Sequence, residues 1–256
     1  MLVVVAHPDD ETFGCGSLLA YAHARGVPAV VACATRGEAS SLTPGRGLDD
    51  ADLAVVRVAE LRAAAALAGV ERVELLEWAD SGMEGPPAPG SLVATPLADV
   101  TDAIRRLIDD IRPTIVVTLD GSDGHRDHAH IRDATLQAAE QASSPPDRVY
   151  LHCLPQQLMR RWVEALRAQQ PNSKHLDRGD LGTPEDQITT VIDTSQFLKV
   201  REEAIALHRS QTSPYEVMPA GLRRQFLTTE QLRRIHPPWT GGPIETEIFN
   251  APAPAT

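Results

Sequence analysis

Short apolar runs alternate along this chain with longer stretches in which apolar residues recur every three or four positions. The runs predict five buried strands, at residues 2–5, 29–34, 73–76, 114–119 and 149–151. The stretches between them predict helices, at residues 14–25, 52–67, 97–111 and 127–142. Gly26 and Gly69 end the first two helices. Pro113 prevents the third from continuing, because proline lacks the backbone N–H that a helix needs.

Strands that alternate with helices form βαβ units, and such units build a parallel sheet with helices on both faces. The expected fold class is therefore α/β, with a doubly wound, mostly parallel sheet of strand order 3-2-1-4-5. A further strand at residues 188–192 and a further helix at residues 197–208 are expected beyond this core. Residues 82–90 and 171–184 are expected to be loops, and the first is long enough to line a pocket.

The length and composition of the chain narrow this picture. A chain of 256 residues suffices for one large domain, expected over residues 1–250, and the Ala/Pro-rich residues 251–256 are expected to be a disordered tail. The net charge of -11 disfavours nucleic-acid binding.

Three scattered cysteines without a CxxC pair argue against a disulfide framework and fit a cytoplasmic location. No segment has the roughly 18 uninterrupted apolar residues that a membrane span needs.

Two clusters of ionisable residues follow two of the predicted strands. His7-Pro-Asp-Asp-Glu11 comes directly after the first strand, and His125-Arg-Asp-His128 begins six residues after Leu119, at the end of the fourth. Burying so much charge is costly unless a metal or a partner neutralises it. Strands 1 and 4 are neighbours where the strand order reverses, and ligands bind at that point. The two clusters are therefore expected to face one crevice.

The residue types in these clusters predict a hydrolytic metal site. His7 and Asp10 lie three positions apart, so one helical turn places both on the same side, and His128 is the third expected ligand. Two histidines and a carboxylate leave a position open for water, as in catalytic zinc sites. Asp9 is the candidate general base for that water. The same ligand set occurs in non-haem iron(II) oxygenases, so Fe²⁺ is the alternative to Zn²⁺, although the motif spacing weighs against oxygenase chemistry.

The second cluster also supplies a candidate acid. His125 is expected to act as general acid or to stabilise an oxyanion, and Asp127 is expected to orient its imidazole.

Both clusters together resemble the PIG-L/LmbE-like family of metal-dependent N-deacetylases. The resemblance spans roughly residues 2 to 211. It includes four further segments in the same order: Thr35-Arg-Gly-Glu38, Arg57-x-x-Glu60-Leu61, Asp80-Ser-Gly-Met83 and His208-Arg-Ser-Gln211. It implies a Rossmann-like three-layer fold and a zinc-dependent hydrolase that removes an acetyl group from an N-acetylglucosamine-type substrate. The expected partner is thus a small amino sugar or glycoconjugate, and the protein could also form a homo-oligomer.

The resemblance also implies roles for individual residues. It makes His7, Asp10 and His128 the metal ligands, Asp9 the general base, and His125 the residue that assists the tetrahedral intermediate or the leaving amine. Arg57 and Asp80 match positions that contact sugar in some members. Where some members have an oxyanion-stabilising tyrosine, this chain has Asp123, which cannot donate a hydrogen bond while ionised.

Other interpretations of the same residues remain open. The carboxylates at positions 9–11 could simply cap a helix, Arg57 and Glu60 could be an exposed intrahelical pair, and His208 could interact only with a helix dipole. For the whole protein, the alternatives are an amidase acting on thiol conjugates through the same site, or a sugar-binding protein without turnover. The complete set of acidic and histidine residues favours an enzyme.

Overall fold

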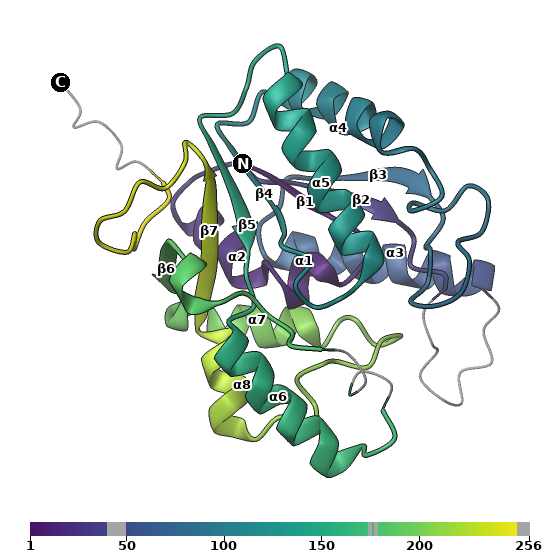
Figure 1. Ribbon diagram of the computed structural model, residues 1–256, viewed down its shortest axis with the longest axis vertical. Helices are drawn as coiled ribbons and strands as arrows, with labels where there is room; N and C mark the ends of the chain where they lie inside the picture. The colour runs from purple at the N-terminus through teal and green to yellow at the C-terminus, as the bar shows by residue number, and fades with distance from the viewer. Residues whose placement is uncertain (40–49, 174–175, 177–178, 250–256) are drawn as a thin grey trace.

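The computed structural model describes residues 1–39, 50–173, 176 and 179–249, and within them seven strands form one sheet of order β3-β2-β1-β4-β5-β7-β6 (Figure 1). The strands are β1 Leu2–Val5, β2 Val30–Thr35, β3 Arg72–Trp78, β4 Ile115–Leu119, β5 Arg148–His152, β6 Thr190–Asp193 and β7 Thr229–His236. The predicted order 3-2-1-4-5 is confirmed, and all four pairings within it are parallel. The predicted tail at residues 251–256 lies outside the described residues.

Eight α-helices surround this sheet in the described part of the chain. They are α1 Asp10–Phe13, α2 Gly16–Ala24, α3 Asp50–Leu67, α4 Leu97–Ile111, α5 Arg126–Gln141, α6 Gln156–Gln169, α7 Leu198–Ile205 and α8 Ala220–Leu227. The first predicted helix, at residues 14–25, is thus preceded by a separate short helix, α1, which carries Asp10 and Glu11. None of the described helices is long and apolar enough to cross a membrane.

Alternating side chains of β1 divide the core into two layers. Leu2, Val4 and Ala6 pack with residues of α4 and α5, whereas Val3 and Val5 pack with residues of α2 and α3 on the opposite face. All five are fully buried, which explains why β1 is a continuous apolar run. In Figure 1, α4 and α5 lie side by side on one face of the sheet.

The far edge of the sheet differs from the prediction. β7 lies between β5 and β6 and is antiparallel to both, and neither β7 nor the helices α6 and α8 were predicted. Helices α6 and α8 pack against each other in a separate apolar cluster that includes Trp162, Leu166, Leu222 and Phe226.

The pairing of β1 positions the candidate site. Val3 pairs with Val31 of β2 on one side and with Val117 of β4 on the other. The carboxyl ends of these parallel strands therefore meet at one edge of the sheet, where both ionisable clusters begin.

Candidate metal centre

The first cluster turns sharply as it leaves β1. The backbone of Asp9 has φ 135° and ψ -27°, a conformation that a residue with a side chain rarely adopts. Asp10 stabilises this turn, because its Oδ2 accepts a hydrogen bond of 2.8 Å from the backbone N–H of His7. The turn brings the side chains of His7 and Asp10 to the same side, as their spacing predicted.

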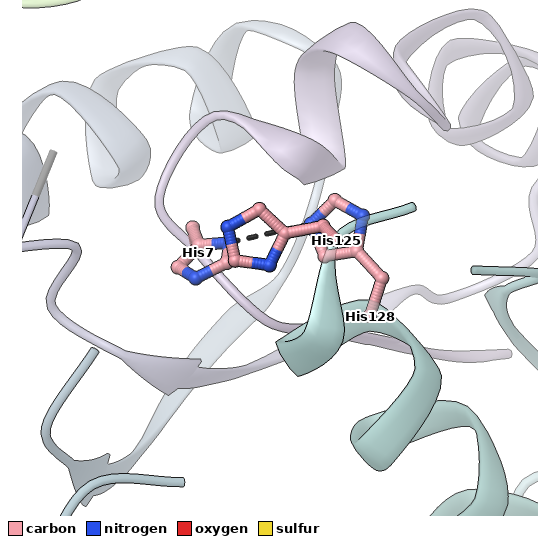
Figure 2. A group of neighbouring side chains, drawn as sticks. All are labelled: His7, His125 and His128. Carbon is pink, nitrogen blue, oxygen red and sulfur yellow. Dashed lines mark hydrogen bonds between the residues drawn. The ribbon is translucent and has the colours of Figure 1, made fainter. Parts of the chain in front are cut away.

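The second cluster forms the first turn of α5. His125 is the N-cap, and its Nδ1 accepts the backbone N–H of Asp127 at 3.2 Å. Figure 2 shows the imidazoles of His7, His125 and His128 gathered at this end of α5, although His7 is 121 positions away from His128 in sequence. The two clusters therefore come together in the structure, as their positions after neighbouring strands predicted.

Three donor atoms at the centre form a nearly equilateral triangle. His7 Nδ1 lies 3.3 Å from His128 Nε2 and 3.4 Å from Asp10 Oδ2, and the last two atoms are 3.2 Å apart. Ligand atoms of a tetrahedral zinc ion, each about 2.0–2.1 Å from the metal, lie about 3.3–3.4 Å from one another. The triangle therefore has the dimensions of one face of a zinc coordination tetrahedron.

The outer nitrogen of each of these two histidines contacts a carboxylate. His7 Nε2 lies 3.1 Å from Asp127 Oδ2, and His128 Nδ1 lies 2.6 Å from Asp123 Oδ2. A carboxylate that accepts the outer N–H leaves the inner nitrogen of a neutral imidazole with a lone pair. Two lone pairs and the Asp10 carboxylate then converge within 3.4 Å, an arrangement that repels itself unless a cation lies between them.

This arrangement corrects two expectations about carboxylates. The side chain of Asp127 orients His7 and not His125, because it turns back toward β1 and also accepts the backbone N–H of Ser81 at 3.0 Å. Asp123 is engaged with His128 and with the backbone N–H of His125 at 3.0 Å, so it does not stand free as a substrate contact in place of a tyrosine.

Without a metal, protons take the place of the cation. Burial opposes charge on His7 and His128, but the carboxylates around them outweigh it. Contacts with Asp10, Asp127 and Asp80 raise the pKa of His7, and Asp10 and Asp123 raise the pKa of His128 to about 10.

His125 behaves differently from the other two histidines. One of its ring nitrogens lies within 4.8 Å of ring nitrogens of His7 and His128, and its ring stacks on that of His128 with centroids 4.6 Å apart. Burial and the two neighbouring imidazoles lower the pKa of His125 to about 3. Since Nδ1 accepts the N–H of Asp127, the neutral ring carries its proton on Nε2. The neutral ring of His125 can therefore donate a hydrogen bond from Nε2.

Asp9 precedes Asp10 in the turn, and its carboxylate contacts an arginine. Its Oδ2 is 3.0 Å from Arg57 Nη2, and the same guanidinium donates to the carbonyl oxygens of Pro8 and Gly37. Burial raises the pKa of the Asp9 carboxyl to about 6, Arg57 opposes the rise, and Asp10 adds to it. Arg57 is only 2% exposed, so it is not part of an exposed intrahelical pair.

Glu11, Glu60 and His208, further residues of the family motifs, make hydrogen bonds near the turn at Asp9. Glu11 is fully buried; its Oε2 accepts the backbone N–H of Asp9 at 2.9 Å, and its Oε1 lies 2.9 Å from His208 Nε2. Glu60 accepts the backbone N–H of Ser210 at 3.0 Å. His208 is therefore engaged with Glu11 rather than with a helix dipole alone.

Asp80 lies at the carboxyl end of β3, on the other side of His7. Its Oδ1 is 3.5 Å from His7 Nε2 and accepts the backbone N–H of Gly82 at 2.8 Å. Burial opposes the charge of Asp80, but these contacts hold the pKa of its carboxyl well below the usual value. The Asp80 side chain thus contacts His7 and its own loop, and its backbone N–H donates to Glu38 Oε1 at 3.0 Å.

A second buried ionic cluster, which was not predicted from the sequence, contacts the end of α1. Arg201 of α7 donates to Glu230 of β7 and to the backbone carbonyl oxygens of Phe13 and Gly14, which end α1. Glu230 also lies 3.1 Å from His152 Nε2. Arg201 and Glu230 are 2% and 1% exposed. Their helix and strand are far apart in sequence, so only the fold brings them together.

Comparison with known proteins gives a consistent result. Residues 2–139 match the family model described as PIG-L, GlcNAc-PI de-N-acetylase. The 1D-myo-inositol 2-acetamido-2-deoxy-alpha-D-glucopyranoside deacetylase of Acidothermus cellulolyticus is 34% identical to this chain over 230 residues, which cover 82% of this chain and 79% of the relative.

Two solved structures share the fold. The N,N'-diacetylchitobiose deacetylase of Pyrococcus horikoshii superposes with a TM-score of 0.57 and 18% identity, over 91% of this chain and 82% of the other. GalB, the 4-carboxy-2-hydroxymuconate hydratase of Pseudomonas putida, superposes with a TM-score of 0.63 and 17% identity, over 94% and 98%. The fold thus carries both a deacetylase and a hydratase, and it does not by itself identify the reaction.

Proposed function

This chain belongs to the PIG-L family, whose model is described as GlcNAc-PI de-N-acetylase, and from that premise we propose that it is a zinc-dependent N-deacetylase. The reaction is hydrolysis of the acetamide of an N-acetylglucosamine-type substrate, which yields a free amine and acetate. The observation that carries the proposal is the triangle of His7 Nδ1, Asp10 Oδ2 and His128 Nε2, with edges of 3.2–3.4 Å.

These three residues are the proposed ligands, and each histidine is oriented by a carboxylate, Asp127 for His7 and Asp123 for His128. Zinc bound there supplies a Lewis acid for the acetamide carbonyl and lowers the pKa of water to about 7. Fe²⁺ suits the same donor set, so metal analysis decides the native ion.

The chain itself supplies the proton transfers. Asp9, the residue next to the ligand Asp10, accepts a proton from the attacking water, and its contact with Arg57 holds the carboxylate in position. His125 donates a hydrogen bond from Nε2 to the acetamide oxygen, which becomes negatively charged when water adds to the carbonyl carbon. Nε2 carries the proton because Nδ1 accepts the backbone N–H of Asp127 at the start of α5. The leaving amine departs after it receives the proton held by Asp9.

The proposed substrate class is a glucosamine N-acetylated at position 2 and joined to a polyol. The relative from Acidothermus cellulolyticus, 34% identical, is named for such a substrate, N-acetylglucosamine linked to myo-inositol. A hydratase reaction like that of the structural neighbour from Pseudomonas putida is the competing possibility. The test therefore includes both types of substrate.

The test measures acetate release from N-acetylglucosaminyl-inositol and from free N-acetylglucosamine, and hydration of 4-carboxy-2-hydroxymuconate, the substrate named for the hydratase neighbour. The zinc content of the purified protein is measured alongside. We expect about one zinc ion per chain and chelator-sensitive acetate release. Asp9→Asn should keep the zinc and lower kcat by roughly 10²–10⁴-fold, the usual contribution of a general base. Asp99→Asn, the same chemical change at an exposed position of α4, is the matched control.

Two results would contradict the proposal. Absence of acetate release from every acetylated amino sugar, with hydration of an enol acid instead, would replace the deacetylase with a hydratase. Full activity of Asp9→Asn would remove Asp9 from the role of base.

A further inference from the structure

We propose that Arg126 is a specificity-determining residue that latches the loop after β3 against the metal centre, so that recognition of the group attached to the amino sugar depends on it. The loop in question comprises residues 81–85 and is called the β3 loop below. Arg126 lies between His125 and Asp127 in the second cluster, but none of the roles above uses it. This inference rests on the proposed function and names the part of the chain that distinguishes one substrate from another.

The guanidinium of Arg126 is bound almost entirely to the backbone of the β3 loop. Its Nε donates to the carbonyl oxygen of Gly82 at 2.6 Å, and its Nη1 to that of Gly85 at 2.7 Å. Its Nη2 donates to the carbonyl oxygen of Ser81 and, at 3.4 Å, to that of Glu84. One side chain thus joins four carbonyl groups within five consecutive residues.

This pattern distinguishes a latch from an anion-binding site. Arginine has five N–H donors in a fixed planar arrangement. The guanidinium of Arg126 makes four hydrogen bonds to the loop, each to a backbone carbonyl oxygen. A substrate phosphate or carboxylate would have to displace those carbonyl groups before it could bind the guanidinium in a bidentate way. The side chain is therefore committed to loop structure.

The β3 loop borders the metal centre. It follows Asp80, whose Oδ1 is 3.5 Å from His7 Nε2, and the backbone N–H of Ser81 donates to Asp127 at 3.0 Å. A Cβ added at Gly82 would lie 3.8 Å from the Cβ of Ala39, so the β3 loop also meets the segment that follows β2. Ligands of doubly wound sheets extend over these loops at the carboxyl ends of the strands.

Consecutive residues at the start of α5 thus have different roles, some at the proposed metal centre and one at the β3 loop. Asp127 and His128 contribute to the centre, whereas Arg126 fixes the position of the β3 loop relative to it. An acetamide held at the proposed ligands would bring the rest of its sugar conjugate near the loop backbone, because Asp80 and Ser81, at the start of the loop, contact His7 and Asp127. Loosening the loop is therefore expected to impair binding of the attached group more than the chemistry at the acetamide.

The test compares Arg126→Ala and Arg126→Lys with Arg106→Ala, which removes an arginine whose side chain is 64% exposed on α4. Hydrogen exchange of the amides at residues 81–85 measures the latch. Zinc content measures the centre, and KM and kcat are measured with N-acetylglucosaminyl-inositol and free N-acetylglucosamine. We expect Arg126→Ala to bind zinc normally, to exchange its loop amides faster, and to raise KM for the inositol conjugate about tenfold, with kcat within about twofold. Lysine keeps the charge and fewer donors, so Arg126→Lys should lie between.

Each outcome decides a separate point. Unchanged loop exchange in Arg126→Ala would refute the latch. Faster exchange with unchanged KM for the conjugate, or an equal rise in KM for both substrates, would refute the role in specificity. Loss of zinc from Arg126→Ala would place Arg126 in the metal centre instead. Absence of any deacetylation by the unmodified protein would refute the proposed function, and the exchange measurement would still decide the latch.

Discussion

Replacing Arg201 by methionine should destabilise this protein strongly, although the residue lies outside the metal centre. The side chain is 2% exposed and donates to Glu230, to Ser17 Oγ at 3.0 Å, and to the carbonyl oxygens of Phe13 and Gly14. Methionine fills much of the same space but leaves the Glu230 carboxylate buried without its main counter-charge. Removing one partner of a buried ion pair costs about 3–5 kcal/mol. At roughly 2–4 °C per kcal/mol for a chain of this size, Tm should fall by about 6–20 °C.

The pH dependence of this loss has a definite sign. Burial opposes ionisation of Glu230, but Arg201 and His152 hold its pKa below the usual value in the unmodified protein. The stabilisation from Glu230 is therefore present above the unfolded pKa of about 4.3 and is lost as the pH falls through the lower folded value. Without Arg201, burial raises the pKa of Glu230 instead. The deficit of the variant should then grow as the pH rises from 5 to 8.

Urea unfolding followed by circular dichroism at pH 5 and pH 8 measures both effects. The double variant Arg201→Met/Glu230→Gln removes the unpaired charge and keeps an oxygen for the backbone N–H of Leu18, so it should recover at least half of the loss. Arg160→Met, on the exposed side of α6, is the control. A loss below about 1 kcal/mol in the single variant, or a double variant no more stable than the single one, would refute the reasoning about the buried pair.

Three other outcomes are expected. Asp123→Asn should weaken zinc binding about 10- to 100-fold in competition with a chromophoric chelator, because His128 loses the carboxylate at its Nδ1; affinity unchanged within twofold would deny Asp123 that role. Gly37→Ala should lower kcat, since its Cβ would lie 2.1 Å from Arg57 Nη1 and displace the arginine from Asp9. Gly26→Ala has nearly the same φ, 67° against 68°, with nothing within 4 Å, so equal effects of the two would contradict displacement of Arg57. Removing metal with a chelator should abolish acetate release and lower Tm, and zinc at about 100 times its Kd should restore roughly 2.7 kcal/mol of stability; a Tm that does not respond to zinc would argue against the centre.

The central sheet was predictable because its strands have an unambiguous pattern. β1 and β4 are fully buried on both faces and read as continuous apolar runs, and the glycines and proline between elements mark the ends of helices. β7 was missed because its sequence, Thr-Glu-Gln-Leu-Arg-Arg-Ile-His, has only two apolar residues. Its Glu230 is buried through Arg201, a pairing that no local pattern reveals.

The ligands of the proposed metal centre were predictable, and their carboxylate partners were not. His7, Asp10 and His128 follow from strand order and from spacing within one turn. The directions of Asp123 and Asp127 depend on a loop and on a helix N-cap, where one backbone angle decides which imidazole a carboxylate reaches. Arg126 gave no signal, because its partners are backbone carbonyl groups of a loop more than 40 positions away.

The place of β1 between β2 and β4 has a consequence for how the protein is made. During synthesis, His7 and Asp10 emerge early, but the strand that pairs with the second edge of β1 ends at Leu119. At about 5–20 residues per second, that edge waits roughly 6–23 s for its partner. Through this interval the growing chain offers an apolar strand edge to chaperones and to other chains, and it holds only half of a metal site. If the proposed zinc site is correct, zinc binding should follow the pairing of β1 with β4, and its rate would measure the time of that step in refolding.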